Sequence, residues 1–508
     1  MTDTPAPHAA AHPAPGTTAA APEYRAAVLV PLFAAARHHG AWYRAIDLAH
    51  AVALHEAGLL AGQDAAALLG AIQALDRDPA LAAPQDAGAF EDLFYLRESR
   101  LRAALGPDLA GRLHTGRSRN DIEATVFRLQ LRTRLAATMR DAAALAARVL
   151  AIAEREAATI ILAYTHGQPA QPTTYGHYLA AYAEVLLRDL ARLAHAMADL
   201  DLCPLGAAAI TTTGFPIDRA RLAALLGFRA PQENSYGCIA AADQYAAVHA
   251  ALRLAFLNIG RLAQDLAFWT GFEVGQAVAP DGFVQISSIM PQKRNPLAIE
   301  HLRTMASLGA GHCETVVATL HNTPFADMVD VEGPTQAAGL AAFDMAGRVL
   351  PLLAAFLDGL RIDTARAQTN IARSCATMTE LADTLVRQEG TSFRSAHEIC
   401  AQLSRTLLDS VRGMDGLRCE DIAAAFRAVL GRTPRTPLVE LLAAAAPAHS
   451  IAVRSRLGGP APAALAASLA RYRASLAGIE RGLDHDAQRW AAAQAALAAS
   501  VASRSGAG

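Results

Sequence analysis

The sequence predicts an all-α protein built from two or three domains. Hydrophobic residues make up 53% of the 508 residues but aromatic residues only 6%, and alanine and leucine supply the balance. Both are strong helix formers, and apolar residues recur at intervals of three and four along long segments. Signals for strands are few and short, and the chain is too long for a single hydrophobic core.

Five long segments in the middle of the chain have the pattern of amphipathic helices. In the clearest, one apolar stripe runs from Leu179 to Leu200, about six turns of helix. The others cover residues 121–161, 252–266, 296–320 and 335–360, the last with Pro351 expected to kink or divide it. Core packing explains each stripe, so these helices are expected to form the scaffold of an elongated bundle.

The predicted organisation has four parts. Residues 1–24 are expected to form a disordered tail, because their Pro, Ala and Thr residues lack the basic start and leucine-rich run of a signal peptide. Residues 25–121 are assigned to an N-terminal helical domain and residues 122–370 to the central helical bundle. Residues 371–508 are assigned to a C-terminal helical domain of shorter helices with a disordered end.

Composition also excludes several classes of function. The chain has 45 Lys+Arg and 47 Asp+Glu, and this near-neutral balance disfavours a nucleic-acid partner. Its six cysteines form no CxxC pair, which argues against a zinc site and a disulfide framework and favours a reducing cytoplasm. The chain contains no run of about 18 uncharged apolar residues, so the sequence predicts no membrane-spanning helix. The sequence therefore predicts a cytoplasmic helical oligomer that does not bind membranes.

Lys293 is the only lysine in the chain, and all other basic residues of the Lys+Arg total are arginine. Arginine can replace lysine at most surface positions, but not where a compact, titratable ammonium group is required. A genome that favours arginine could leave one lysine by chance. The alternative is that the chemistry of the protein requires a lysine at this position.

Three polar segments could carry chemistry. Residues 114–121 read HTGRSRND directly before a predicted helix, and helix N-termini and arginine forks both bind carboxylates. Residues 164–172 read YTHGQPAQP and place His166, a potential general acid or base, among hydroxyl and amide groups. The first segment could instead be a solvated connection between helices, and a lone histidine such as His166 more often has a structural role.

The third segment, ISSIMPQKRNP at residues 286–296, places two serines before the lone lysine and reads as a mobile loop that closes over a site. A serine acts as a base only when nearby cations or N–H dipoles stabilise its alkoxide. Lys293, six residues after Ser287, could supply that charge. An ordinary loop before a helix has a similar composition.

Together the three segments resemble the signature regions of the aspartase/fumarase superfamily, most closely those of argininosuccinate lyases. The third segment is similar to the superfamily's loop GSSxMPxKxNP, and HTGRSRND and YTHxQxAQP are typical of the argininosuccinate lyase branch. Similar stretches at PLG (204–206), FPIDR (215–219), LADTLVR (381–387) and FRSAHE (393–398) extend the resemblance from about residue 25 to about residue 480.

This resemblance implies a fold, an assembly and a reaction. The family has three mainly helical domains, and its central bundle forms the core of a homotetramer in which three subunits contribute to each active site. It uses no metal ion or organic cofactor. Its members remove an amine or hydroxyl from a succinyl group and release fumarate, through a doubly negative aci-carboxylate that needs dense positive charge and N–H donors. The implied partner is a small N-substituted aspartate.

The resemblance also assigns roles to residues. Ser287 matches the catalytic base, and His166 the group that protonates the leaving amine, paired with Glu300 of another subunit. Lys293 matches a residue that stabilises the intermediate. The positions that match substrate-binding residues are Ser118, Arg119, Asn120, Thr165, Gln292 and Asn295.

Several departures from the family concern the substrate. Ile286 and Leu297 replace a glycine and an aspartate of the signature loop, and Phe94 replaces the histidine of an EDxH pattern. At the amine end of the site the family's tyrosine, glutamine and lysine correspond to Asp327, Glu332 and about Thr335, and a serine corresponds to Leu32.

Three alternatives follow. The first is argininosuccinate lyase activity, in which argininosuccinate yields arginine and fumarate. The second is the same chemistry on an N-substituted aspartate with a more cationic amine, as in ethylenediamine-disuccinate lyase. The third is a non-catalytic structural member, as some lens crystallins are.

Overall fold

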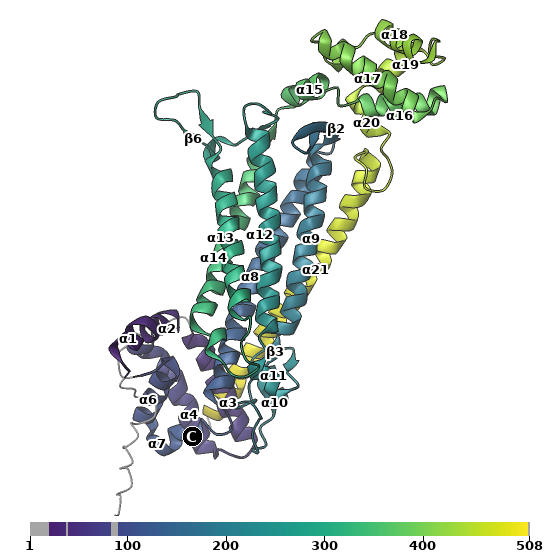
Figure 1. Ribbon diagram of the computed structural model, residues 1–508. Helices are drawn as coiled ribbons and strands as arrows, with labels where there is room; N and C mark the ends of the chain where they lie inside the picture. The colour runs from purple at the N-terminus through teal and green to yellow at the C-terminus, as the bar shows by residue number, and fades with distance from the viewer. Residues whose placement is uncertain (1–19, 37–38, 83–89, 506–508) are drawn as a thin grey trace, which may run out of the picture.

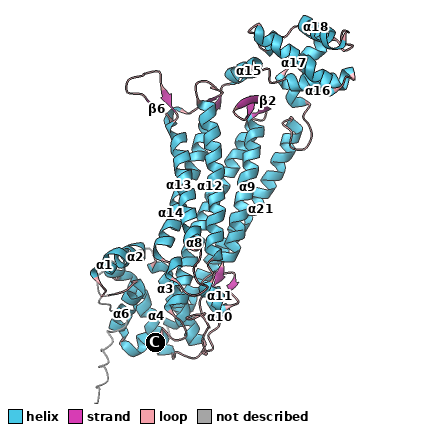
Figure 2. Ribbon diagram, in the orientation of Figure 1, coloured by secondary structure: helices cyan, strands magenta, loops and turns pink. Residues whose placement is uncertain are grey.

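The computed structural model describes residues 20–36, 39–82 and 90–505, and helices dominate this part of the chain. Figure 1 shows a long bundle with one group of shorter helices at each end, and Figure 2 shows that the few strands lie at the ends of the bundle. The predicted all-α class is confirmed.

The bundle contains all five of the predicted long helices and one further helix. Its members are α8 (Arg119–Arg155), α9 (Tyr175–Leu200), α12 (Asp243–Thr270), α13 (Leu297–Thr319), α14 (Gly333–Gly359) and α21 (Pro462–Ser505). Successive helices run in opposite directions, so the connections between them alternate between the two ends (Figure 1). Buried side chains from all six helices form one large hydrophobic core.

Local sequence explains where the first bundle helices begin. Ser118 caps α8 in a capping box with Asp121, which satisfies backbone N–H groups that have no partner within the helix. Thr174 caps α9 by accepting a hydrogen bond from the backbone N–H of His177 at 3.0 Å. Helix α8 ends at Arg155, earlier than predicted, and the β-branched Ile160 and Ile161 belong to a strand instead.

Helix α14 is the most apolar helix of the bundle. It continues through Pro351, so this proline does not divide the helix as predicted. By length and composition alone, residues 329–359 would suffice to cross a membrane. In the structure, however, α14 packs against α13 and α8 and buries Phe343, Leu353 and Phe356 in the bundle core. It is therefore a core helix of the bundle.

The N-terminal helices pack around a second hydrophobic core that also takes side chains from the beginning of α8 and the end of α21. They are α2 (Val30–Ala36), α3 (Gly40–Glu56), α4 (Gly62–Ala74), η2 (Leu75–Arg77), α5 (Pro79–Ala82), α6 (Leu93–Leu105) and α7 (Pro107–Arg112). They are preceded by α1 (Pro22–Tyr24) and the π-helical turn η1 (Arg25–Leu29). The predicted tail at 1–24 lies outside the described residues up to residue 19, whereas its last residues form α1.

Short strands pair in four two-stranded sheets, which lie in the segments that connect the helices. The pairs are β1 (Ile160–Thr165) with β2 (Gln168–Thr174), β3 (Leu202–Cys203) with β4 (Ala230–Pro231), β5 (Ala277–Val278) with β8 (Arg361–Ile362), and β6 (Gln285–Ile286) with β7 (Arg294–Asn295). The connections also contain α10 (Arg219–Leu225), α11 (Ser235–Ala240), η3 (Asp281–Phe283) and η4 (Val329–Val331).

The C-terminal helices form a third core at the opposite end of the bundle. They are α16 (Met378–Glu389), α17 (Phe393–Asp409), η5 (Met414–Gly416), α18 (Cys419–Leu430) and α19 (Leu438–Ala444). The flanking helices α15 (Thr364–Arg373) and α20 (Pro447–Ala452) pack against the strands of the second segment. The predicted domain at 371–508 differs from the structure in its last part, because α21 leaves these helices and packs along α8 and α9. The helix extends to Ser505, and the predicted disordered end at 506–508 lies outside the described residues.

Candidate active site

The first predicted segment forms the tight connection between α7 and α8. Ser118 and Asn120 lie together at the start of α8, where the Ser118 hydroxyl donates to the Asn120 side-chain oxygen at 3.3 Å. The Asn120 amide donates to the carbonyl of Ala209 at 3.2 Å. Buried Asp121 accepts hydrogen bonds from the backbone N–H groups of Ser118, Gly206 and Ala208. The PLG stretch is thereby fixed against the start of α8.

The two arginines of this segment have different surroundings. Arg117 is buried and donates to Asp47 at 2.8 Å, so its charge faces the protein interior. Arg119 is partly exposed, bonds Asp92 at 2.9 Å and Glu91 at 3.3 Å, and lies over the ring of Tyr95. Asp92 also caps α6 by accepting from the Tyr95 N–H. Of the two guanidinium groups, only that of Arg119 is open to a ligand.

A cavity of about 180 Å³ lies beside Arg119, between the N-terminal helices and the start of α14. Four acidic side chains line it, those of Glu91, Asp92, Glu123 and Glu332, and Glu123 also accepts a hydrogen bond from the Tyr43 hydroxyl. Burial, together with the neighbouring carboxylates of Asp92 and Glu332, raises the pKa of Glu123 to about 8. Burial likewise raises the pKa of Glu332. The cavity therefore concentrates carboxyl groups that the protein only partly neutralises.

The positions matched to the amine end of the family's site lie around this cavity. Glu332 and Leu32 line it, and Asp327 lines an adjoining recess together with Asn120. Thr335 is buried in α14 and lines neither space, whereas Gln336, the next residue along the helix, lines both. Near the third amine-end position, Gln336 rather than Thr335 therefore faces these spaces.

The second segment is a β-hairpin at the opposite end of the bundle. Thr165 pairs with Gln168, so His166 and Gly167 occupy the two turn positions. Both have positive φ, 55° for His166 and 72° for Gly167, as a two-residue hairpin of right-handed twist requires. Left-handed backbone in a residue other than glycine is uncommon and clusters at functional sites. The turn exposes the side chains of Thr165 and His166 to solvent.

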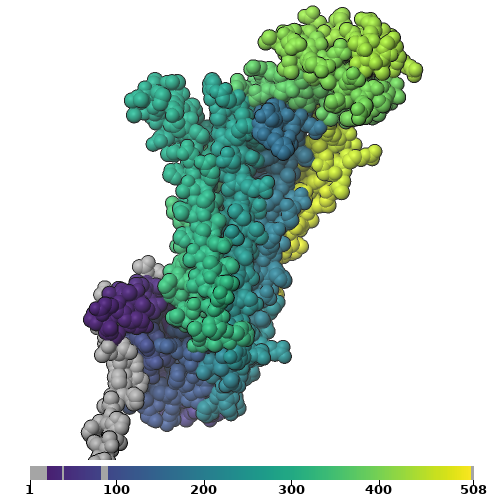
Figure 3. Space-filling model, viewed as in Figure 1, coloured from purple at the N-terminus to yellow at the C-terminus, as the bar shows by residue number. Residues whose placement is uncertain are grey.

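The third segment is also a hairpin, and it projects beyond the end of the bundle (Figure 3). Its neck is formed by Gln285 opposite Asn295 and Ile286 opposite Arg294, and Ser287 and Lys293 occupy the next position on each side. The Ser287 hydroxyl oxygen accepts hydrogen bonds from the backbone N–H groups of Ile289, at 3.3 Å, and Met290, at 3.0 Å. Two N–H dipoles therefore point at the oxygen that would carry the charge of an alkoxide.

The remaining predicted residues of this region face solvent to different extents. Gln292 and Lys293 are exposed in the loop, Asn295 is half-buried in β7, and Glu300 is exposed in the first turn of α13. Within the part of the chain that the structure describes, the Lys293 ammonium group has no ion pair, and Glu300 makes no contact with His166. Ile286 lies in extended backbone paired with Arg294, so the glycine of the family's loop is not needed there for positive φ.

A single chain does not bring the three segments together. Ser118–Asn120 lie at one end of the bundle, and both hairpins lie at the other (Figure 1). Helix α8 alone has 37 residues, which corresponds to about 55 Å at 1.5 Å per residue. The residues predicted to bind one small substrate are thus too far apart within one chain.

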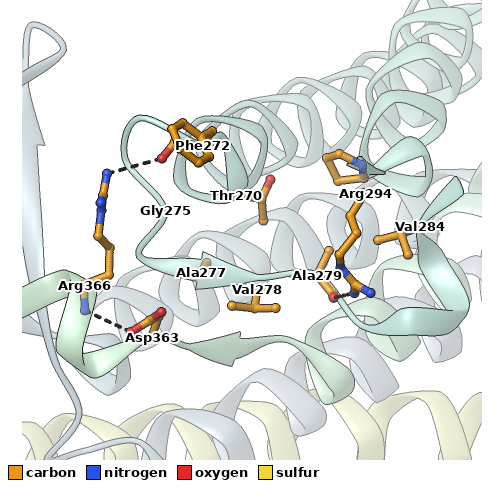
Figure 4. A pocket seen from close by; sticks show the side chains of 11 residues that line it. Thr270, Phe272, Gly275, Ala277, Val278, Ala279, Val284, Arg294, Asp363 and Arg366 are labelled. Carbon is orange, nitrogen blue, oxygen red and sulfur yellow. Dashed lines mark hydrogen bonds between the residues drawn. The ribbon is translucent and has the colours of Figure 1, made fainter. Parts of the chain in front are cut away.

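A second cavity, of about 300 Å³, lies at the base of the third segment (Figure 4). Arg294 and Arg366 project from its rim, but the first bonds Asp281 and the carbonyl of Ala279, and the second bonds carbonyls of residues 272–274. Neither Ser287 nor Lys293 lines this cavity. This cavity therefore lies at the neck of the hairpin and apart from the residues that are predicted to be catalytic. In the described ranges, no group of three or more His, Cys, Asp or Glu side chains could hold a metal ion.

Sequence reasoning missed residues that shape the first segment. Glu123 follows Arg119 by four positions in α8, and this helical spacing places both side chains at the same cavity. Asp47 and His50 lie one turn apart on α3, far from the segment in sequence, and both contact it. The i, i+4 spacing could have identified Glu123, whereas no local signal points to Asp47 and His50.

The comparison with known proteins gives a consistent family. Residues 49–308 match the family model described as Lyase, and residues 375–445 match the model described as Argininosuccinate lyase C-terminal. The chain is 48% identical to argininosuccinate lyase 2 of Agrobacterium fabrum over 484 residues, which is 95% of each protein. It is 37% identical to the argininosuccinate lyase of Methanoculleus marisnigri, covering 85% of this chain and 86% of that protein.

Among solved structures, an EDDS lyase variant with bound fumarate superposes with a TM-score of 0.83 at 30% identity, over 96% of this chain and 97% of the other. The stretches that match the two family models include the bundle helices α8, α9 and α12, both hairpins and the C-terminal helices α16 to α19. The chain therefore belongs to the argininosuccinate lyase branch of the aspartase/fumarase superfamily, and it is a carbon–nitrogen lyase.

Proposed function

We propose that the protein cleaves argininosuccinate to arginine and fumarate and takes part in arginine biosynthesis. The observation that carries this proposal is the Ser287 hydroxyl oxygen, which receives two backbone N–H groups beside the only lysine of the chain. This environment stabilises an alkoxide, and a serine alkoxide can remove the weakly acidic proton next to a carboxylate. The 48% identical relative from Agrobacterium fabrum is an argininosuccinate lyase, which supports the choice of substrate.

The proposed reaction assigns one task to each residue. Ser287 removes a proton from the carbon next to the substrate carboxylate, while Lys293 and Asn295 hold that carboxylate and stabilise the aci-carboxylate. Collapse of this intermediate breaks the C–N bond and forms the double bond of fumarate. His166, oriented by Glu300, donates the proton that the departing amine requires. Ser118, Arg119, Asn120, Thr165 and Gln292 bind the rest of the substrate.

This reaction requires several chains, because the catalytic hairpins and the Ser118–Asn120 segment lie at opposite ends of the bundle. Antiparallel packing of bundles from different copies would bring opposite ends together. Large apolar side chains exposed on α12 and α13 support such packing: Leu254, Leu257, Phe268 and Leu308. We propose a homotetramer with sites shared between subunits, a cytoplasmic location and no requirement for a metal ion or cofactor.

A second substrate class is favoured by one specific observation, the acidic cavity beside Arg119. Its four carboxyl groups are better suited to an amine with additional positive charge than to the carboxylate end of an amino acid. An N-substituted aspartate that carries a diamine would place its second ammonium group among Asp92, Glu123 and Glu332. The EDDS lyase structure, at 30% identity, is a more distant relative than the argininosuccinate lyase at 48% identity.

The test is fumarate release, followed by ultraviolet absorbance, from argininosuccinate and from a panel of N-substituted aspartates. Turnover of argininosuccinate at a rate normal for such lyases supports the first proposal. Release only from a diamine-bearing aspartate supports the second substrate class. A folded protein that releases fumarate from none of these compounds would contradict both proposals and favour a non-catalytic role.

Sharing of the site between subunits has its own test. Ser287→Ala alters one end of the bundle and Asn120→Ala alters the opposite end. Each variant alone is expected to be inactive. Mixed tetramers would contain some sites with neither substitution, if each site takes these residues from different chains. Recovery of activity after the two variants are unfolded and refolded together is expected, and its absence in tetramers shown to be mixed would contradict a shared site.

A further inference from the structure

Two buried side chains of α3 hold the connection that leads into Ser118, and neither belongs to the predicted site. Asp47 is 5% exposed and His50 is fully buried, one helical turn apart. The Nε2–H of His50 donates to the carbonyl oxygen of Thr115 at 2.9 Å, because a carbonyl can only accept. One oxygen of Asp47 accepts from Arg117 at 2.8 Å.

These contacts bracket a tight turn. Gly116, between the two held residues, has a φ of 72°, and a Cβ atom there would meet the Ile217 side chain at 2.5 Å. Arg117 is followed directly by Ser118, whose cap fixes the first turn of α8. The backbone from Thr115 to Ser118 is therefore held by α3 on one side and enclosed by Ile217 on the other. Movement at either contact would be transmitted to Ser118, Arg119 and Asn120.

Stability alone is a poor explanation of this network. The second oxygen of Asp47 accepts from Arg97 of α6 at 3.1 Å, so one buried carboxylate serves two buried guanidinium groups. Among the described residues, the Nε atoms of Arg97 and Arg117 and the Nδ1 atom of His50 have no hydrogen-bond partner. Buried ion pairs with unsatisfied atoms are often less stable than apolar packing of the same volume. Such a network instead imposes a defined position on the groups that it joins.

We propose that Asp47 and His50 are positioning residues for the substrate-binding segment, Asp47 through Arg117 and His50 through the Thr115 carbonyl. The proposal rests on the proposed function only in that Ser118–Asn120 bind the substrate. Neither residue touches the reacting atoms. Their effect is to keep Asn120 and the open guanidinium of Arg119 in one place before the substrate arrives.

The shared carboxylate provides a matched pair of variants. Arg117→Lys and Arg97→Lys both keep the positive charge, both shorten the reach to Asp47, and both alter a buried side chain. Only Arg117 belongs to the segment that leads into Ser118. We expect similar losses of melting temperature but a KM raised about tenfold or more only in Arg117→Lys, since small misplacements of binding groups have effects of this size. Equal KM values in the two variants would overturn the role of Asp47.

His50 provides a second, independent pair. In His50→Gln the side-chain amide can still donate to the Thr115 carbonyl, whereas His50→Leu fills similar space without a donor. We expect a raised KM with little change in kcat in the leucine variant, and a return toward the wild-type KM in the glutamine variant. Two variants with the same KM would overturn the role of His50, because a packing effect alone does not depend on the donor.

Hydrogen exchange of residues 113–120 separates this proposal from the proposed function. Faster exchange in Arg117→Lys than in Arg97→Lys, and in His50→Leu than in His50→Gln, supports the proposal that α3 holds this segment. Unchanged exchange overturns the proposal. Turnover by the wild-type protein is measured first. If the wild-type protein released no fumarate, the proposed function would be contradicted, whereas exchange would still report whether α3 fixes the segment.

Discussion

The hydroxyl oxygen of Ser287 accepts a hydrogen bond from the backbone N–H of Met290, at 3.0 Å, and so lies within the turn of its own loop. The second N–H, from Ile289, approaches the same oxygen. Both donors come from the backbone, so they remain when side chains of the loop are changed. This arrangement leads to the first of four predictions.

Ser287→Ala is expected to lower turnover by about a hundredfold or more, because removal of a proton-transfer group has effects of this size. Folding is expected to be unaffected, since the loop lies outside the bundle core. Ser288→Ala is the matched control, because the neighbouring serine is exposed. Steady-state fumarate release and a melting curve check both points, and more than about a tenth of wild-type activity in Ser287→Ala would contradict its role as base.

Lys293→Arg is expected to abolish most turnover although it keeps the charge. The guanidinium is broader, more weakly hydrated and always protonated, so it cannot reproduce a compact ammonium group beside the intermediate. Arg294→Lys makes the reverse change one residue later, where the arginine is paired with exposed Asp281, and its effect is expected to be small. Comparison of kcat/KM for the two variants tests the assignment, which fails if Lys293→Arg retains the wild-type value.

The pKa of Glu123 makes stability depend on pH. Its pKa in the folded protein is raised to about 8, above the ordinary value of 4.5. The folded state then holds a proton that the unfolded state has lost, so this contribution to stability is present at low pH and disappears as the pH rises toward 8. Glu123→Gln keeps an acceptor for Tyr43 and cannot ionise. The melting temperature of wild type relative to Glu123→Gln is expected to fall between about pH 5 and about pH 8.

The exposed Glu233 provides the control for this experiment. Glu233→Gln is expected to leave the pH dependence of wild-type stability unchanged. If the difference in melting temperature between wild type and Glu123→Gln stays constant over the same pH range, the carboxyl group of Glu123 does not titrate there.

Packing between α12 and α13 depends on Gly309. A Cβ atom at this position would lie 2.4 Å from the ring of Phe256, so Gly309→Ala is expected to destabilise the protein by about 1–3 kcal/mol through overpacking. Gly311, two residues later in the same helix, has no atom near its Cβ position within 4 Å. Gly311→Ala is therefore expected to stabilise the protein by up to about 1 kcal/mol, because alanine is the better helix former.

Denaturant unfolding of both alanine variants under identical conditions measures the two changes. An equal effect of the two substitutions would show that backbone propensity, rather than contact with Phe256, determines the cost at Gly309.

Helical periodicity and end signals made much of the fold predictable. Ser118 followed by Asp121 marks the start of α8, and the stripe from Leu179 to Leu200 matches the buried face of α9. Both signals depend on residues that are close in sequence, so they can be recognised without knowing which segments the helix packs against. Assignment of α21 failed because its apolar pattern is sparse, with Leu469, Leu476 and Leu483 seven residues apart. Only packing against α8 and α9 shows that these leucines belong to the bundle.

The sequence by itself determined the chemical groups available to this protein: a lone lysine, the serine of the third segment, the histidine of the second and the paired arginines of HTGRSRND. The catalytic and binding roles of these residues stay predictions. Only the tertiary structure decided that Arg117 turns inward to Asp47 while Arg119 faces a cavity, and that the segments lie at opposite ends of the bundle. The physical reason is that charge pairing and burial depend on residues far apart in sequence, whereas spacing along the chain reports only local geometry.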